Sequence, residues 1–280
     1  MDVHPYGTYS PTALQRWAIG RGGDLKPGFF GKQAASILKR LAGARSGRPV
    51  DIELFNGVKA RLHGRDNSCE RRVLCTPQFW DAAERAFIAE AIRNSESDAP
   101  FYYVDIGANA GLYALFVASE LRRAGRRLKT VLLEPEPEML RRLQFNLAAN
   151  KIAGALVLPW AAAAEAGRAQ FAVSTNNRGE SRLSGDMTAD RPITVECRPL
   201  LAALDAGDIL RPDLLKIDIE GGEYAVLRAF FDSAPADRLP GMILIETFHE
   251  KADARASALC EAAGYRPVLA TKLNTIYARS

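Results

Sequence analysis

The residues that could do chemistry in this chain are carboxylates at the ends of apolar, β-branched segments. Asp105 lies near the end of the segment 101–106, and a turn that contains Gly107 and Gly111 follows it. A strand, a glycine turn and a helix place backbone N–H groups and a helix N-terminus against a negatively charged ligand. A carboxylate in this position would repel a pyrophosphate, whereas it would attract a ligand that carries an amine and a sulfonium.

The glycine turn offers further contacts to such a ligand. Gly107 and Gly111 let the backbone turn sharply and approach a cofactor, and Ala108 and Asn109 lie between them. We expect Asp105 to accept hydrogen bonds from a ligand amino group, directly or through water, and Asn109 to bind a ligand carboxylate or the loop. A dinucleotide fingerprint needs the spacing G-x-G-x-x-G, which this turn lacks. The alternative is a turn that only packs a helix, with the aspartate as its N-cap.

The apolar segment 128–133 ends at Glu134-Pro135, and Trp160-Ala161 follows the next apolar segment. A carboxylate at the tip of the second strand of a doubly wound sheet can bind both ribose hydroxyls of an adenosine. We therefore assign Glu134 to a ribose, with Pro135 fixing its direction; a solvated surface glutamate is the alternative. Trp160 and Ala161 would lie near the adenine, where the tryptophan either stacks on the ring or belongs to the core.

A second acidic centre is the segment Lys216-Ile-Asp218-Ile-Glu220-Gly-Gly-Glu223. Alternation along a strand places Lys216, Asp218 and Glu220 on one side. In the expected strand order this strand lies beside the first, so Asp218 opens onto the same crevice as Asp105. Asp218 and Glu220 could contact the ligand or act as general base toward an acceptor hydroxyl. An ion pair with Lys216 and a divalent-cation site are the alternatives; we rank the cation lower and expect no metal.

A third catalytic candidate is His249, which follows the segment 242–246. Glu246, at the end of that segment, could orient His249 or bind the ligand. Histidine titrates near neutral pH and can serve as a base there. A structural role is the alternative, and which of Asp218, Glu220 and His249 is the base stays open.

These side chains require a sheet whose strands end at one edge. Apolar and β-branched runs predict strands over 101–106, 128–133, 155–159, 214–219, 242–246, 265–269 and 275–279. Amphipathic segments predict helices between them over 111–123, 137–150, 222–231 and 252–264. The alternation predicts an α/β, Rossmann-like, doubly wound sheet of seven strands. The last strand must be antiparallel, since only a few residues join it to the strand before.

An insertion interrupts the alternation after residue 159. Residues 168–175 and 192–197 are expected as two strands, with a short helix over 199–204. The polar loop 176–190 between the two strands holds Arg178, Glu180, Ser181 and Arg182. A loop of this length inside a compact domain is usually functional or disordered. A lid that faces the substrate and a solvated hairpin loop are the two interpretations.

Three regions follow from the pattern: an N-terminal extension over 1–49, a hairpin and helix over 50–99, and the main domain over 100–280. Residues 1–26 are expected to be irregular, as a floppy tail, a lid or a dimer arm, and a single helix is expected over 29–41. Asn56-Gly57 predicts a type I′ hairpin turn between strands 50–55 and 58–62. An amphipathic helix is expected over 77–94.

The overall composition indicates a globular protein and gives little information on its partners. The chain has 280 residues, 48% hydrophobic and 25% charged, as expected for a globular protein with a full core. Its net charge of +4 is weak support for a nucleic-acid partner. The four cysteines form no metal-binding pattern. Without a signal peptide or a run of roughly 20 apolar residues, we expect a soluble cytoplasmic protein with reduced thiols.

Three blocks together resemble the FkbM family of S-adenosylmethionine-dependent methyltransferases. They are Asp105-Ile-Gly-Ala-Asn-Ala-Gly-Leu-Tyr113, Glu134-Pro-Glu-Pro137 and Leu215-Lys-Ile-Asp-Ile-Glu-Gly-Gly-Glu-Tyr224, which Val226-Leu227 continues. The resemblance covers about residues 79–250. It implies the class I methyltransferase fold, S-adenosylmethionine as cofactor, and O-methylation of a small molecule, often a sugar or a polyketide-type natural product.

Two other functions stay open. An RNA methyltransferase is supported by the basic charge and by Arg122, Arg123, Arg126 and Arg127, although those arginines also suit a helix C-terminus. The absence of an Asn-Pro-Pro-Tyr block argues mildly against methylation of base amino groups. A protein that binds the cofactor without catalysis is the other alternative. We expect a small-molecule acceptor, no membrane and no nucleic acid, and a homo-oligomer stays open.

Overall fold

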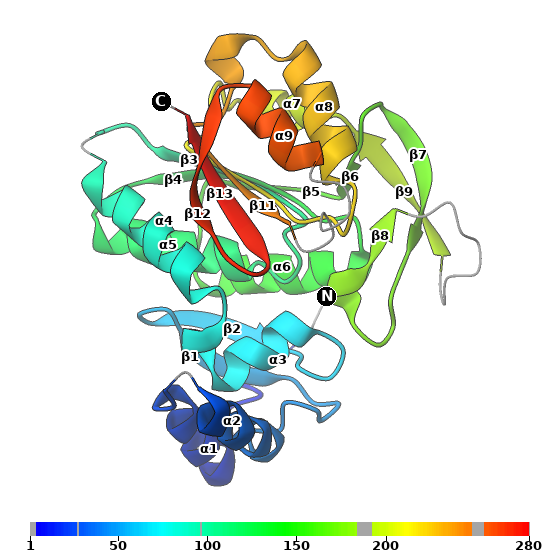
Figure 1. Cartoon of the computed structure of the whole chain (residues 1–280). Coiled ribbons are helices and arrows are strands. Elements are labelled where there is room, and N and C mark those ends of the chain that lie inside the picture. Colours follow the sequence, from blue (N-terminus) through cyan, green and yellow to red (C-terminus); the bar gives the residue numbers. More distant parts are fainter. Residues whose placement is uncertain (1–3, 27, 96, 184–191, 248–254, 280) are drawn as a thin grey trace.

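The centre of the molecule is a twisted sheet, shown in Figure 1 in a computed structural model that describes residues 4–26, 28–95, 97–183, 192–247 and 255–279. Its strands are β3 (Phe101–Ile106), β4 (Leu128–Leu133), β5 (Ala155–Leu158), β10 (Leu214–Ile217), β11 (Met242–Glu246), β12 (Tyr265–Ala270) and β13 (Asn274–Arg279). They lie in the order β12-β13-β11-β10-β3-β4-β5. Both pairs that contain β13 are antiparallel and the other pairs are parallel. The predicted sheet, with its last strand reversed, is confirmed.

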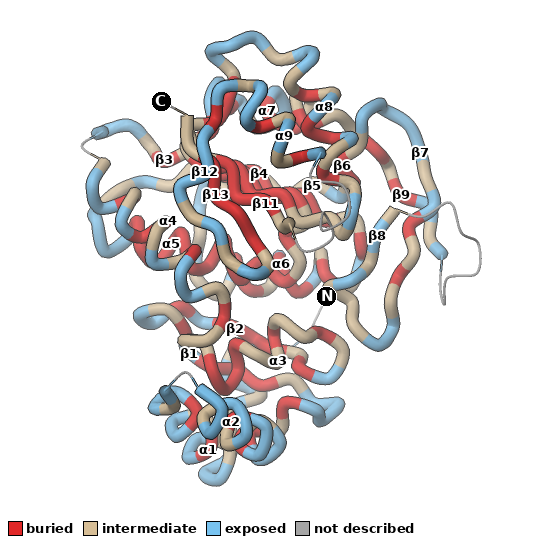
Figure 2. Tube along the Cα trace, in the orientation of Figure 1, coloured by how far each residue is buried: buried red, intermediate tan, exposed pale blue. Residues whose placement is uncertain are grey.

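Helices cover both faces of the sheet. One face carries α4 (Ala82–Asn94), α5 (Leu112–Arg123) and α6 (Pro137–Ala149), and the other carries α7 (Leu200–Ala206), α8 (Glu223–Ser233) and α9 (Arg255–Ala262). Successive residues of β3 serve opposite cores, because Tyr103 packs in the first and Val104 in the second. Figure 2 shows the strands as the most buried part of the chain. Burial on both faces explains why the strands read as nearly continuous apolar runs.

The N-terminal extension is more ordered than its composition predicts. It holds two helices, α1 (Ala13–Gly23) and α2 (Phe29–Leu41). The expectation of an irregular segment over 1–26 is therefore wrong for residues 13–23. Thr12 and Gln15 form a reciprocal capping box at the start of α1, and Ala18 is buried in a small core with Leu38 and Cys75. Capping and packing outweigh the glycines that lower the helix propensity of this segment.

A hairpin joins the extension to the main core. Its strands are β1 (Val50–Leu54) and β2 (Val58–Leu62), and α3 (Ser68–Cys75) and the 3₁₀ turn η1 (Pro77–Phe79) follow. The hairpin is confirmed, but its loop has three residues because Leu54 pairs with Val58. The predicted helix over 77–94 begins only at Ala82, and α3 was not predicted. Apolar hairpin side chains share the core of α4, α5 and α6.

The insertion forms a second, smaller sheet instead of two strands and a loop. Its elements are β6 (Trp160–Ala162), β7 (Gly167–Ala172), the 3₁₀ turn η2 (Arg178–Glu180), β8 (Arg182–Leu183) and β9 (Pro192–Arg198), in the sheet order β6-β9-β7-β8. The chain thus leaves the main sheet at Pro159 and β6 pairs with β9. One further 3₁₀ turn, η3 (Ala236–Arg238), precedes β11. Within the described segments, no helix combines the length and apolar character needed to cross a bilayer.

Candidate functional site

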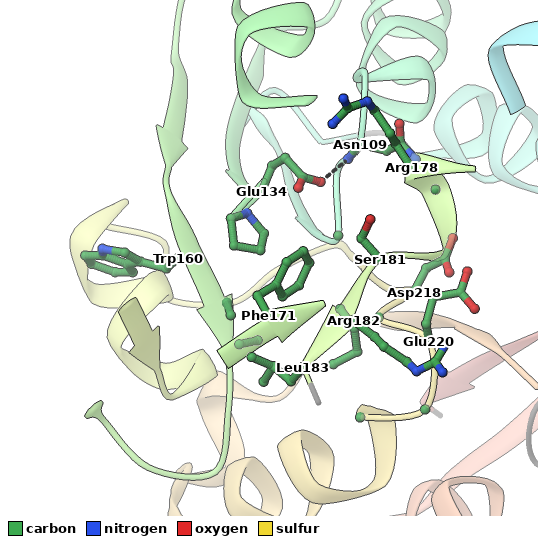
Figure 3. Close-up of a pocket in the computed structure, with 18 residues that line it drawn as sticks. Asn109, Glu134, Trp160, Phe171, Arg178, Ser181, Arg182, Leu183, Asp218 and Glu220 are labelled. Atoms are coloured by element: carbon green, nitrogen blue, oxygen red, sulfur yellow. Dashed lines mark hydrogen bonds between the residues drawn. The ribbon is translucent and has the colours of Figure 1, made fainter. Parts of the chain in front are cut away.

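The carboxyl ends of β3, β4 and β10 open into a cavity of about 320 Å³, here called the strand-end cavity. The strand ends supply Gly107, Glu134 and Asp218 to its wall, and the small sheet closes it with Phe171 and Leu183 (Figure 3). Doubly wound folds bind ligands at this edge, where the strand order reverses. The order in this sheet reverses between β3 and β10, so the cavity lies at that switch point.

Glu134 presents a buried carboxylate to the cavity, only 6% exposed. Its Oε2 accepts a hydrogen bond from the backbone N–H of Asn109 at 2.8 Å (Figure 3). Its Oε1 accepts one from the backbone N–H of Glu136 at 2.9 Å. Each carboxylate oxygen keeps a further lone pair, so two ligand hydroxyls can still donate to it. Burial raises the pKa of Glu134 to about 7. The charge of this carboxylate therefore changes near neutral pH.

The glycine turn after β3 contributes part of its length to the wall. Gly107 and Asn109 line the cavity, whereas Ala108 and Gly111 do not. Gly107 has a φ of +81°, and a Cβ atom there would collide with the carbonyl oxygen of Asp218. Glycine thus permits the close approach of the β3 turn to the end of β10. Gly111 also has a positive φ, +83°, as the N-cap of α5, so it shapes the turn from outside the wall.

Asp105 lies beneath the cavity and not in its wall. Its side chain is fully buried, where it accepts a hydrogen bond from the Tyr103 hydroxyl at 2.8 Å and pairs with Lys216 Nζ at 3.2 Å. Burial raises the pKa of Asp105, and the charge of Lys216 opposes that rise. Lys216 Nζ also lies 3.2 Å from the carboxylate of Asp218. The three residues form a chain of charges that ends in the cavity wall.

The segment after β10 is held in an unusual backbone conformation. Glu220 has a φ of +59°, a left-handed conformation that a non-glycine residue adopts only where its surroundings enforce it. The carboxylate of Glu223, at the start of α8, accepts hydrogen bonds from the backbone N–H groups of Ile219 and Gly221, each at 2.9 Å. Glu223 therefore fixes the loop that presents Asp218 and Glu220.

A second cavity of about 260 Å³, here called the acidic cavity, adjoins the first. Asp218, Glu220, Asn109 and Gly179 line both cavities. The acidic cavity is otherwise walled by parts of α3, the start of α4, the end of β11 and the turn between β12 and β13. The two cavities thus meet at the end of β10.

Three carboxylates converge where the two cavities meet. Oxygen atoms of Asp218, Glu220 and Glu246 lie within 4.8 Å of one another. Burial, followed by the charges of Asp218 and Glu220, raises the pKa of Glu246 to about 9. Glu246 therefore holds a proton at neutral pH, which removes one negative charge from the cluster.

The same cluster has the oxygen ligands that Mg²⁺ and Ca²⁺ prefer. The ammonium group of Lys216, 3.2 Å from Asp218, already supplies one positive charge to it. A divalent ion would therefore lie close to a cation, and the proton on Glu246 would compete with it. The arrangement favours acid–base chemistry over metal binding.

The small sheet is fixed over the strand-end cavity by Arg178. Its guanidinium pairs with Asp66 at 2.9 Å and with Glu136 at 3.0 Å, and its backbone N–H bonds the carbonyl oxygen of Asp66. These contacts join η2 to the N-terminal part of the chain and to the start of α6. The described first part of the predicted lid loop is therefore anchored and forms part of the cavity wall. The rest of that loop, residues 184–191, lies outside the described part of the chain.

Two aromatic side chains flank the strand-end cavity, and they differ in direction. Trp160 lines it, but its ring points away from Glu134 in Figure 3 and lies 5.6 Å from the guanidinium of Arg198. The ring of Phe171 points into the cavity toward Glu134 (Figure 3). Phe171 is thus the better placed ring to stack on a ligand base.

The structure brings most of the predicted site residues together at one edge. Those in the wall of the strand-end cavity are Gly107, Asn109, Glu134, Pro135, Trp160, Ala161, Asp218 and Glu220. Asp105, Ala108 and Gly111 lie behind the wall, and His249 lies outside the described residues. The sequence did not single out Phe171 as a ligand contact or Glu223 as the residue that fixes the β10 loop. Glu246, which the sequence offered as a residue that orients His249 or binds the ligand, lies beside Asp218 and Glu220.

Comparisons with known proteins place the chain among methyltransferases. Residues 105–267 match the family model of the methyltransferase FkbM domain. Three solved structures that are similar to this chain differ in length and source. The METTL16 methyltransferase domain has 11% identity over 98% of both chains, with a TM-score of 0.48. TYW2 of M. jannaschii in complex with AdoMet has 13% identity over 84% of this chain and 88% of that chain, with a TM-score of 0.39. Precorrin-6y C5,15-methyltransferase of Geobacter metallireducens has 15% identity over 70% of this chain and 87% of that chain, with a TM-score of 0.41. No curated protein sequence matched this chain.

Proposed function

Since this chain belongs to the FkbM family of S-adenosylmethionine-dependent methyltransferases, we propose that it methylates a hydroxyl oxygen of a small polyhydroxylated molecule. The observation that carries the proposal is the cluster of Asp218, Glu220 and Glu246 at the junction of the two cavities. Carboxylates accept hydrogen bonds from hydroxyl groups and can take their protons.

The strand-end cavity suits the methyl donor. Glu134 offers a recessed carboxylate for two ribose hydroxyls, and Phe171 offers a ring face for the adenine. Gly107 lets the turn after β3 lie close to the end of β10, which shapes the wall of this cavity. Bound S-adenosylmethionine supplies an electrophilic methyl carbon, and the remaining work falls to the side chains around it.

The acidic cavity suits the acceptor. Its wall offers oxygen and amide groups to hydroxyls, from Asn109, Asn177 and Asn274 among others, and Trp80 offers an aromatic surface. An acceptor hydroxyl between Asp218 and Glu220 would face the strand-end cavity and have a carboxylate at hand for its proton. Alignment of the oxygen with the methyl carbon and removal of its proton are what such a transfer requires.

The arginines that could favour RNA lie away from both cavities. Arg126 bonds the carbonyl oxygen of Ile92, and Arg127 bonds that of Asp98. Both precede β4, so they lie at the opposite edge of the sheet from the strand ends. This placement supports a small-molecule acceptor over RNA.

The test is methyl transfer from deuterated S-adenosylmethionine to a panel of sugars and other polyols, followed by mass spectrometry and NMR of the product. We expect an O-methyl group. Glu220→Gln should lower the rate at least 100-fold while S-adenosylhomocysteine still binds. Glu165→Gln is the matched control, because Glu165 is an exposed glutamate outside both cavity walls, and this variant should transfer at nearly the wild-type rate. A product methylated on nitrogen or carbon, or an unaffected Glu220→Gln variant, would contradict the proposal.

A further inference from the structure

A third cavity, here called the basic cavity, lies between α2 and α3 and has a volume of about 350 Å³. Six cationic side chains line it: Lys32, Lys39 and Arg40 of α2, Arg45 of the following turn, and Arg71 and Arg72 of α3. Ser36 and Ser68 complete the wall, which contains no carboxylate. A hollow that gathers this much charge of one sign raises the local concentration of anions.

The cationic side chains of the basic cavity form no ion pair with any described residue. Across the described part of the chain, none of these six side chains has a carboxylate oxygen within the 4.0 Å of an ion pair. Arg71 donates to the backbone carbonyl oxygens of Gly64 and Arg65. Burial and the charge of Arg72 lower the pKa of Lys39, as expected where cations repel one another.

Two arginines with low exposure elsewhere in the chain have acidic partners, unlike the exposed and half-exposed cations of the basic cavity. Arg142 is held by Asp66, Glu70 and Glu138. Arg178 is held by Asp66 and Glu136. In both cases carboxylates surround an arginine that joins elements of the fold. Among the described residues, the cations of the basic cavity have no such partner and are at least partly exposed, so they are available to an anion from outside the chain.

The basic cavity adjoins the proposed acceptor site. Ser68 and Arg72 line both the basic cavity and the acidic cavity. The acidic cavity in turn shares Asp218 and Glu220 with the strand-end cavity. The three cavities therefore form one series, which runs from the strand ends past α3 to α2.

We propose that the acceptor carries a phosphate or diphosphate group, which binds in the basic cavity while its hydroxylated part lies in the acidic cavity. This inference rests on the proposed function, since it takes the acidic cavity as the acceptor site. Phosphate esters carry up to two charges per group and offer several acceptor oxygens, which arginine binds bidentately. A carboxylate supplies only one negative charge, so a phosphate or diphosphate balances more of the six cations. A phosphorylated sugar and a sugar linked to a diphosphate both fit, and they share the chemistry that the basic cavity recognises.

The binding test uses inorganic pyrophosphate as the probe and calorimetry on the full chain. We expect saturable binding at one site to the wild-type protein. The double variant Arg40→Gln/Arg45→Gln, which changes two exposed wall residues, should weaken it at least tenfold. Arg21→Gln is the matched control, because Arg21 is an exposed arginine of α1 outside this wall, and it should bind as the wild type does. Equal pyrophosphate affinity in the double variant, or no saturable binding, would overturn the inference.

Kinetics separate this inference from the proposed function. For a sugar phosphate acceptor, the double variant should raise KM at least tenfold with little change in kcat, and the dephosphorylated sugar should show no difference between the proteins. If no hydroxyl compound is ever methylated but pyrophosphate binds through Arg40 and Arg45, the proposed function fails and the anion site stands. Displacement of pyrophosphate by single-stranded RNA in a length-dependent way, or by anionic phospholipid vesicles, would assign the basic cavity to a polymer or a membrane and overturn the inference.

Discussion

The ammonium group of Lys216 lies 3.2 Å from the carboxylate of Asp105, in a part of the core that the solvent does not reach. The sequence pattern indicated that Asp105 would receive a ligand amino group. The structure gives that carboxylate a cationic partner from within the chain. Lys216 contacts Asp218 on its other side, so the buried pair positions a carboxylate that does line both cavities.

This arrangement predicts a stability effect. Asp105→Asn keeps the shape of the side chain and removes its charge, which leaves Lys216 with Asp218 alone. Loss of one partner of a buried ion pair typically costs about 3–5 kcal/mol, so we expect the free energy of unfolding to fall by about 3 kcal/mol. Adding Lys216→Met to Asp105→Asn should recover at least half of that loss, because no buried charge is then left unpaired. Denaturant unfolding of Asp105→Asn, Lys216→Met and the double variant measures the coupling energy between the two residues. Additive losses of unfolding free energy would contradict this prediction.

The carboxylate of Glu134 predicts that ligand binding depends on pH. Because burial raises its pKa to about 7, the group is ionised above that pH and protonated below it. A protonated carboxyl is a poorer acceptor for ribose hydroxyls, so the affinity for S-adenosylhomocysteine should fall as the pH decreases from 8 to 6. Calorimetry across this range tests the sign. In the control variant Glu134→Asp, the shorter carboxylate does not occupy the same buried position, so the pH dependence of the affinity should shift or disappear. An affinity of the wild type that stays constant from pH 8 to 6 would contradict the assignment of Glu134 to the ligand.

Glu246 predicts a change in stability with pH. Its pKa rises from 4.5 in the unfolded chain to about 9 in the folded one. The stability that its proton contributes is therefore complete below pH 4.5 and is lost as the pH rises through 9. Glu246→Gln keeps a neutral group at every pH, so its melting temperature should exceed that of the wild type by a margin that grows from pH 6 to pH 9. Each kcal/mol of unfolding free energy corresponds to about 2–4 °C in melting temperature. The control is Glu90→Gln, at an exposed position, whose melting temperature should show no such trend relative to the wild type.

The carboxylate cluster also predicts the response to metal removal. Lys216 and the proton on Glu246 supply positive charge beside Asp218, so transfer should proceed at an unchanged rate in millimolar EDTA. Addition of Mg²⁺ or Mn²⁺ after chelation should give no increase. Loss of activity in EDTA that Mg²⁺ restores would show instead that Asp218, Glu220 and Glu246 hold a cation.

The main sheet could be predicted because its strands are buried on both faces and read as apolar runs between amphipathic helices. The helix over residues 13–23 could not be predicted, because Gly20, Gly22 and Gly23 give this segment a low helix propensity. Its stability comes from a capping box and from packing on α2 and α3. The strand-end residues Glu134 and Asp218 follow from their places at the tips of parallel strands. The acidic and basic cavities could not be predicted from the sequence, because their walls combine α3 with elements that lie far from it in sequence.

The measurement that bears most directly on the central claim is calorimetric titration of S-adenosylhomocysteine into the wild-type protein, Glu134→Ala and Glu165→Ala. Glu134 lines the strand-end cavity, whereas Glu165 is an exposed glutamate outside its wall. If this cavity holds the methyl donor, the wild type and Glu165→Ala bind equally, and Glu134→Ala binds at least tenfold more weakly, a loss of about 1.4 kcal/mol. Melting temperatures of the three proteins confirm that each is folded. Equal affinity in a folded Glu134→Ala variant would contradict the account.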